Sequence, residues 1–171
     1  MNFKEFTEAS KRTAPFNGEP QNHIEHEHLM ANYSMGLLGE SVELLEEVLV
    51  GSGLDAKKEM GDVAHYACIL GEVVGLKFDF ELRKMDMTTT DTLTALTFAA
   101  KQVSEVSKKY VFHRHEFNAV DYRMPLKFIL QAIYSLCEQW GLKLSEVLEG
   151  NIDKLKERYP EKFDTEKSIN R

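Results

Sequence analysis

Residues 39–44 read GESVEL and residues 58–63 read KEMGDV, and these two short segments decide the fold. Each segment holds two carboxylates spaced three positions apart, so on a helix both members of a pair project from the same face. The four acids are Glu40, Glu43, Glu59 and Asp62. Between the pairs, GSGL at 51–54 is typical of a helix stop, and Asp55 is a candidate N-cap for the next helix. The pattern predicts a helical hairpin whose antiparallel arms gather four acids into a site for a hard cation.

The acids of the second arm begin the apolar stripe of their helix. At 100° per residue, Glu59, Asp62 and Tyr66 fall within about 60° of one another, and apolar side chains surround that line. On the first arm Glu40 and Glu43 share a face in the same way. Partly buried carboxylates that face one another repel and lose hydration, unless a cation or shared protons compensate. The alternative is a solvated acidic face with ordinary surface ion pairs.

Length and composition restrict the class of protein. A chain of 171 residues with 43% hydrophobic residues is long enough for one moderate domain with a proper core. The net charge of −7 argues against nucleic acid as a partner, since nucleic-acid binding needs clustered cations. No segment approaches the roughly 20 apolar residues of a membrane span, and the first residues do not resemble a signal peptide. Cys68 and Cys137 lie in apolar helical segments and are expected to be reduced core thiols of a cytoplasmic protein.

Periodicity and helix stops predict an all-α fold, because no strand pattern of useful length occurs. The expected helices cover Phe3 to about Arg12, 26–50, 55–74, a short helix within 76–87, a helix from the capping signal at 88–91 to about 111, a helix from about Met124 to Gly141, and 145–158. We expect a single domain over 1–171. Residues 26–87 form its metal-binding hairpin, and residues 88–160 form a second hairpin with a C-terminal helix.

Three histidines lie close together before the first acidic helix, at positions 23, 26 and 28. Their spacing matches no closed zinc site. We therefore expect a solvated or substrate-lining segment, with a metal site as the alternative.

The second hairpin resembles the first in sequence. GEVVGLKF at 71–78 is similar to CEQWGLKL at 137–144, and 38–50 matches the pattern of 99–111. We interpret this as a degenerate tandem duplication, although two amphipathic hairpins can also look alike by chance. Lys101 and Ser104 occupy the positions of the first acid pair, and Pro125 and Phe128 those of the second. The second hairpin is thus expected to be a lid or scaffold.

The order Glu40-x-x-Glu43, fifteen residues, Glu59-x-x-Asp62 resembles the signature of the MazG-like all-α nucleoside triphosphate pyrophosphohydrolases, a superfamily that includes dimeric dUTPases and dCTP pyrophosphatases. The flanking sequences LGE at 38–40 and GDV at 61–63 agree, as does Tyr66. The segment NIDKLKERYP at 151–160 also resembles the end of many MazG-like proteins of bacteria and phages. The resemblance covers roughly 28–86 and that tail. The second, acid-free hairpin departs from the short members of the family.

The resemblance implies a helical bundle that hydrolyses a (d)NTP to a (d)NMP and pyrophosphate by attack of water on the α-phosphorus. It implies that the four acids bind Mg²⁺, with Mn²⁺ able to substitute, since these hard cations prefer oxygen ligands. It also implies a homo-oligomer, dimer or tetramer, in the cytoplasm of a bacterial or phage-infected cell. Candidate phosphate contacts are Lys84, Lys154 and Arg158, and Tyr66 is a candidate contact for phosphate or sugar. Candidate base contacts are Asn32 and the aromatic-bearing segment with Phe16, His28 and Tyr33.

Two other interpretations of the acids stay open. A di-iron carboxylate bundle also places acids inside helices, but it needs two Glu-x-x-His motifs. Here only Asp62-x-x-His65 comes near. A non-enzymatic helical protein that pairs with a partner is the other alternative.

Overall fold

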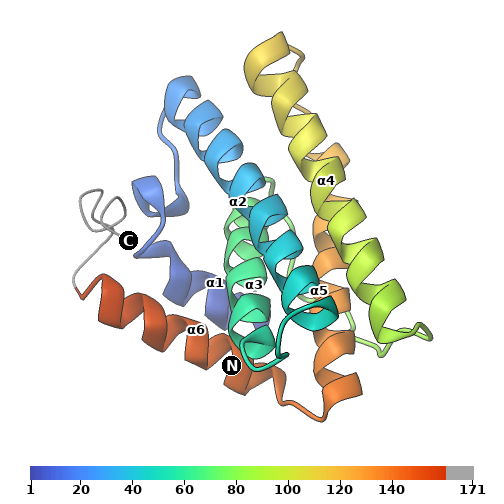
Figure 1. Ribbon diagram of the computed structural model, residues 1–171. Coiled ribbons are helices and arrows are strands. Elements are labelled where there is room, and N and C mark those ends of the chain that lie inside the picture. Colours follow the sequence, from blue (N-terminus) through green and yellow to red (C-terminus); the bar gives the residue numbers. More distant parts are fainter. Residues whose placement is uncertain (161–171) are drawn as a thin grey trace.

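The computed structural model describes residues 1–160, which form six α-helices and one 3₁₀ turn and contain no strand (Figure 1). The elements are α1 (Phe3–Lys11), η1 (Pro15–Gly18), α2 (His23–Leu49), α3 (Ala56–Val73), α4 (Thr89–His113), α5 (Val120–Trp140) and α6 (Leu144–Arg158). The predicted all-α class is confirmed. No helix within these residues is long and apolar enough to cross a membrane.

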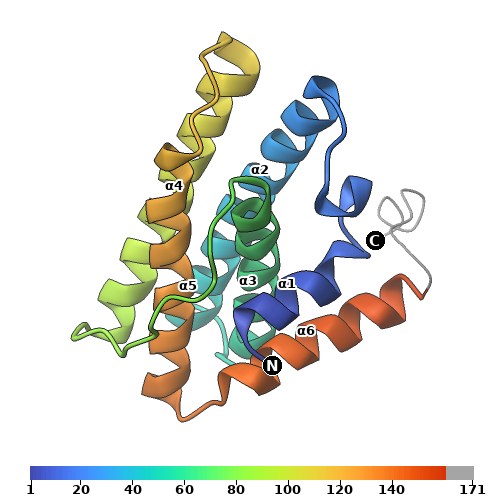
Figure 2. The same ribbon diagram turned by 180° about the vertical axis from the view of Figure 1, so that it is seen from behind.

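Helix α3 lies at the centre of the molecule. It contacts α2 and α5 within a four-helix arrangement completed by α4, and its other side is covered by α1 and α6, which run obliquely across it (Figures 1 and 2). Twelve of its 18 residues are buried, against seven of 27 in α2. A helix enclosed on several sides holds its side chains in fixed positions. The acids on α3 are therefore carried by the most buried helix of the described residues.

Two helix starts differ from the prediction. Helix α2 begins at His23, since the side chain of Asn22 accepts the N–H of Glu25 and caps it, so the histidine segment is helical. Helix α5 begins at Val120, four residues before the predicted start, with Asn118 accepting the Val120 N–H. Pro125 lies inside α5, where its buried ring packs in the core. Proline cannot donate the backbone hydrogen bond of this helical position, and burial of its ring offsets the free energy lost with that bond.

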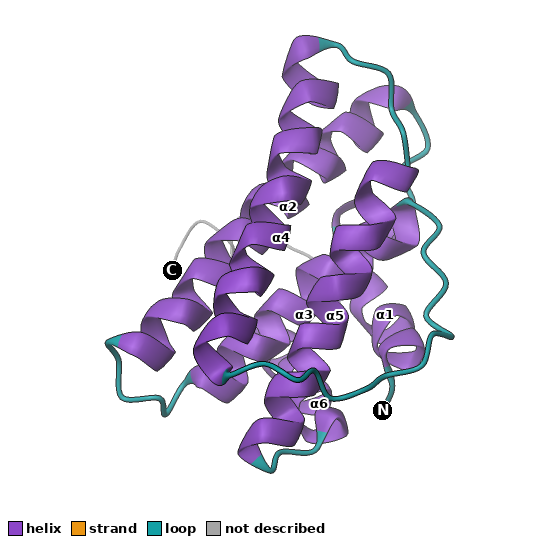
Figure 3. Cartoon of the chain, turned by 90° about the vertical axis from the view of Figure 1, so that its right-hand side faces the viewer, coloured by secondary structure: helices purple, strands orange, loops and turns teal. Residues whose placement is uncertain are grey.

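The predicted short helix within 76–87 is wrong. Residues 74–88 form a long loop that runs beside α5 to the start of α4 (Figures 2 and 3). Side chains of α5 form hydrogen bonds with backbone groups of this loop. Arg123 donates to the carbonyl of Val74 at 2.8 Å, and Ser135 accepts the Met85 N–H at 3.1 Å. Gln139 donates to the carbonyl of Met87 at 3.2 Å. Backbone groups held in this way are satisfied without forming a helix.

The segments that suggested a duplication end their helices in the same way. Gly75 and Gly141 follow α3 and α5 with φ of 65° and 67°, a conformation that favours glycine. The next residue donates back into the helix in both cases, Leu76 to Gly71 at 2.7 Å and Leu142 to Cys137 at 2.9 Å. The shared GLK sequence thus has a structural reason, a glycine-based C-terminal cap. Duplication of the whole hairpin stays a prediction.

Gly61 allows α6 to approach α3 closely. A Cβ atom at position 61 would lie 2.8 Å from Cβ of Asn151 and 3.3 Å from the carbonyl oxygen of Val147. Gly61→Ala is therefore expected to lower the free energy of unfolding by about 1–3 kcal/mol through overpacking. Urea unfolding measures the change.

Gly150→Ala is the matched control, because Gly150 is an exposed glycine of α6 where an added Cβ would meet no atom within 4 Å. That change should raise the free energy of unfolding by about 0.5–1 kcal/mol through helix propensity. Equal effects of the two substitutions would contradict the close approach of α3 and α6.

Candidate functional site

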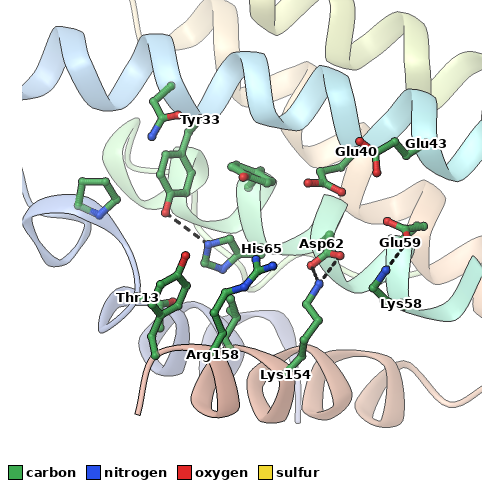
Figure 4. A pocket seen from close by; sticks show the side chains of 15 residues that line it. Thr13, Tyr33, Glu40, Glu43, Lys58, Glu59, Asp62, His65, Lys154 and Arg158 are labelled. Carbon is green, nitrogen blue, oxygen red and sulfur yellow. Dashed lines mark hydrogen bonds and ion pairs between the residues drawn. The ribbon is translucent and has the colours of Figure 1, made fainter. Parts of the chain in front are cut away.

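A cavity of about 290 Å³ opens between α2, α3 and α6 (Figure 4). Its walls combine acidic, basic and aromatic side chains from four parts of the chain. The lining residues are Thr13, Pro15, Asn32, Tyr33, Glu40, Glu43, Lys58, Glu59, Asp62, His65, Tyr66, Lys154, Leu155, Arg158 and Tyr159. Most of the residues that the sequence singled out are thus in one place.

Three of the four acids form a compact group at one end of the cavity. Oxygen atoms of Glu40, Glu43 and Glu59 lie within 4.8 Å of one another. Glu43 is exposed, Glu40 is half-buried, and Glu59 is only 7% exposed. A set of three carboxylates with no sulfur or nitrogen suits a hard divalent cation such as Mg²⁺ or Mn²⁺. The residues present therefore fit the metal that the resemblance implies.

Asp62 lines the same cavity but is bound to α6 instead of joining this group. Lys154 donates to both of its carboxylate oxygens, and the side-chain amide of Asn151 donates to Oδ1 at 2.7 Å. A second lysine, Lys58, lies 3.0 Å from Glu59. Two cations thus offset part of the negative charge of four acids.

The crowding of acids changes the protonation of Glu40. Burial, and then the charges of Asp62, Glu43 and Glu59, raise the pKa of its carboxyl to about 7, while Lys154 acts in the opposite direction. Desolvation and like charges both disfavour the ionised form. In the metal-free protein Glu40 therefore titrates near neutral pH.

Aromatic side chains form the other end of the cavity. The rings of Tyr33 and Tyr66 lie 5.0 Å apart, and His65 contacts both, with its Nε2 3.3 Å from the Tyr33 hydroxyl. Burial lowers the pKa of His65 to about 4, so its imidazole is neutral at neutral pH. Gly36 makes room for this cluster, because a Cβ atom there would lie 2.3 Å from the Tyr66 ring.

The structure places the predicted contact residues unequally. Asn32, Tyr33, Tyr66, Lys154 and Arg158 line the cavity. Lys84 does not line the cavity, because it lies exposed in loop 74–88 beside α5. Phe16 and His28 pair edge to face at 5.8 Å, outside the lining residues.

Two of the three histidines near the start of α2, His23 and His26, contact Tyr110 of α4, and His26 also contacts the loop after α4. His26 Nδ1 lies 3.0 Å from the hydroxyl of Tyr110, and His23 Nδ1 lies 3.3 Å from the same atom. The ring of His26 also packs on Phe117 at 4.6 Å. Within residues 1–160 the acid group is the cluster with metal-ligand geometry, and no histidine belongs to it.

Sequence reasoning missed five lining residues, Thr13, Pro15, Lys58, Leu155 and Tyr159, and considered His65 only as a metal ligand. Thr13 and Pro15 follow α1, and Tyr159 follows α6. Arg12 joins these two helix ends, donating to the Tyr159 carbonyl at 2.6 Å. Such a long-range contact leaves no signal in a local pattern. Tyr159-Pro160 indicates in sequence only a helix stop.

A scan against models of protein families, a search of curated proteins and a search of solved structures each found no match. The resemblance to the MazG-like enzymes therefore depends on the motif residues alone.

The raised pKa of Glu40 predicts how stability depends on pH without metal. The folded protein holds a proton on Glu40 up to about pH 7, whereas an unfolded chain releases it near the ordinary carboxyl pKa of 4.5. A raised carboxyl pKa costs stability above the folded value, and acidification recovers that loss. In EDTA, Glu40 should thus contribute a rise in the free energy of unfolding as pH falls from about 8 to about 5.5. His65, whose pKa is lowered from 6.5 to about 4, contributes a fall below about pH 6.5, so the contribution of Glu40 is measured as the difference between the urea unfolding profiles of the native protein and Glu40→Gln.

Glu40→Gln should remove this rise and stabilise the protein at about pH 8. Glu105→Gln is the matched control on α4, because Lys108 lowers the pKa of Glu105 and keeps its titration below this pH range. It should retain the native pH profile. A profile that Glu40→Gln leaves unchanged would show that Glu40 is an ordinary surface acid.

Proposed function

We propose that the protein is a Mg²⁺-dependent nucleoside triphosphate pyrophosphohydrolase that converts a (d)NTP into a (d)NMP and pyrophosphate. One observation carries the proposal. A single cavity has three clustered carboxylates at one end, Tyr33 and His65 at the other, and Lys154 and Arg158 of α6 between them (Figure 4). This order matches the parts of a nucleotide, with phosphates beside the cation-binding acids and the base or sugar against the aromatic side chains.

Glu40, Glu43 and Glu59 would hold the cation, Mg²⁺ or Mn²⁺. Such a cation supplies charge neutralisation of the triphosphate and lowers the pKa of nearby water. One of these glutamates would orient the attacking water toward the α-phosphorus and accept its proton. The oxygen of that water forms the new bond to the α-phosphorus. At the same time the bond between the α-phosphorus and the α,β-bridging oxygen breaks, and pyrophosphate leaves.

Side chains of α6 would stabilise the leaving pyrophosphate. Lys154 and Arg158 both line the cavity, and their charges can offset the negative charge that develops on the leaving group. Asn32 also lines the cavity, and its amide would contact the base or sugar together with the neutral imidazole of His65 and the Tyr66 ring.

Exposed apolar side chains support the proposal of a homo-oligomer. Met35, Val42 and Leu49 recur every seventh residue along α2, and 58%, 36% and 53% of their surfaces are exposed. Phe98 and Phe112 are exposed on α4, which packs beside α2. Met35 and Phe112 line the same pocket, and exposed apolar side chains that meet in this way are typical of interfaces between subunits. We propose a dimer or tetramer that acts in the cytoplasm of a bacterial or phage-infected cell, without nucleic acid or membrane as a partner.

The acid group is less suited to a di-iron centre. Such centres use histidine ligands beside the carboxylates. In residues 1–160 the acid group contains no histidine, and Nε2 of His65 is directed to the Tyr33 hydroxyl. A non-enzymatic partner protein would not need acids gathered in a cavity at a cost in stability.

The activity is tested by incubating the protein with Mg²⁺ and each common NTP and dNTP in ¹⁸O-labelled water. Pyrophosphate should be released, and the label should enter the nucleoside monophosphate because water attacks the α-phosphorus. Glu40→Gln should lower kcat by about 10²–10³-fold, the loss typical of one electrostatic group at a reacting centre.

Glu105→Gln, on a face of α4 away from the cavity, should leave kcat unchanged. Release of orthophosphate as first product, or label in pyrophosphate, would exclude the proposed bond cleavage. Equal losses in both variants would show that the site is elsewhere.

A further inference from the structure

Asp62 differs from the other three acids because α6 supplies it with two hydrogen-bond partners. Lys154 donates to both of its carboxylate oxygens, and Asn151 donates to Oδ1 at 2.7 Å. The side chain of Asp62 is 14% exposed and that of Lys154 30%. Asp62 and Lys154 thus form a half-enclosed ion pair at the edge of the acid group, and the pair carries no net charge.

We propose that Lys154 is an internal counter-ion that stays paired with Asp62 until a phosphate group binds its ammonium. The acid group then binds its cation more tightly when phosphate is present. The nature of the phosphate ligand rests on the proposed function. The counter-ion role itself follows from the contacts of Lys154 and from the position of Asp62 in the cavity.

The surroundings of the pair let one partner move and hold the other in place. Gly61 lets α6 pack directly on α3, which fixes the backbones at Asp62 and Asn151. The Asn151 side chain is buried, and its Oδ1 atom has no hydrogen-bond partner among the described residues. Lys154 is the mobile partner, because its ammonium lies at the end of a long flexible chain and lines the open cavity.

Charge explains why the exchange would couple phosphate to cation. While Lys154 is paired with Asp62, the cation is attracted by the three acids of the group. The neutral Asp62–Lys154 pair adds no net charge to this attraction. A phosphate group that takes over the lysine frees the Asp62 carboxylate, which adds a fourth negative charge beside the cation. At separations of several ångströms near a protein surface, one such charge changes the binding of a divalent cation by about tenfold or more.

The first test measures Mn²⁺ binding alone, by the electron paramagnetic resonance signal of free Mn²⁺ at fixed ionic strength. Lys154→Met should bind Mn²⁺ about tenfold more tightly than the native protein, because Asp62 loses its counter-ion. Lys156→Met is the matched control: it removes the same charge from an exposed lysine of α6 that pairs with Asp153. Its affinity should equal that of the native protein. Equal affinities of the two variants would overturn the proposal.

The double variant Asp62→Asn/Lys154→Met tests the same idea in a chain that leaves no buried charge unpaired. Its Mn²⁺ affinity without phosphate should match that of the native protein, since a neutral pair replaces a neutral ion pair. Adding inorganic phosphate, with a protein-free titration as reference, should tighten Mn²⁺ binding of the native protein by about fivefold or more. It should not do so for the double variant. Phosphate that tightens both, or neither, would overturn the proposal.

Neither titration measures hydrolysis, so the two proposals can fail separately. If the titrations behave as described and no nucleotide is hydrolysed, only the proposed function is wrong. If nucleotides are hydrolysed and Lys154→Met binds Mn²⁺ like Lys156→Met, only the counter-ion is wrong.

Discussion

Repulsion between four carboxylates in one cavity is the constraint on which the rest of the structure depends. Three acids bring their oxygens within 4.8 Å, and the fourth lines the same cavity. Such crowding opposes folding unless cations or protons offset it. The protein uses both: Lys154 and Lys58 pair with two of the acids, and the pKa of Glu40 rises to about 7. Because these carboxylates repel one another without metal, binding of a divalent cation should stabilise the folded protein strongly.

The remaining elements hold the acids against this repulsion. Helix α3 is enclosed by α1, α2, α5 and α6, so the two acids that it carries cannot move apart without disturbing the core. The turn between α2 and α3 is tied by Glu47, which accepts the N–H of Asp55 and the hydroxyl of Ser52. No residue of α4 or α5 lines the cavity within the described chain. The second hairpin thus packs as a scaffold for the first and does not cover the cavity as a lid.

The features best predicted from sequence are those that local chemistry decides. Thr88, whose side chain accepts the Asp91 N–H, and Gly75, with its positive φ, set helix boundaries close to those expected. The i, i+3 spacing of the acids likewise places each pair on one helix face, and residues of α2 and α3 meet in the cavity as the hairpin requires.

Features that depend on contacts distant in sequence were not predictable. The pairing of Asp62 with Lys154 joins residues 92 positions apart, and it separates one acid from a group that spacing alone would keep together. The sequence predicts a short helix within loop 74–88, whereas Gln139 of α5 binds a backbone carbonyl of this loop. No local sequence pattern shows that contact. The same holds for Tyr159, which lines the cavity and whose carbonyl accepts a hydrogen bond from Arg12, 147 positions away. In each case a tertiary contact overrides local preference.

Anomalous diffraction from crystals grown with Mn²⁺ and a nucleoside triphosphate analogue with a methylene bridge between the α- and β-phosphates tests the central claim most directly. An anomalous peak should lie between the carboxylates of Glu40, Glu43 and Glu59, with phosphate oxygens beside it and the base against Tyr33 and Tyr66. A peak at the histidines of α2, or nucleotide bound away from the acid group, would contradict the account.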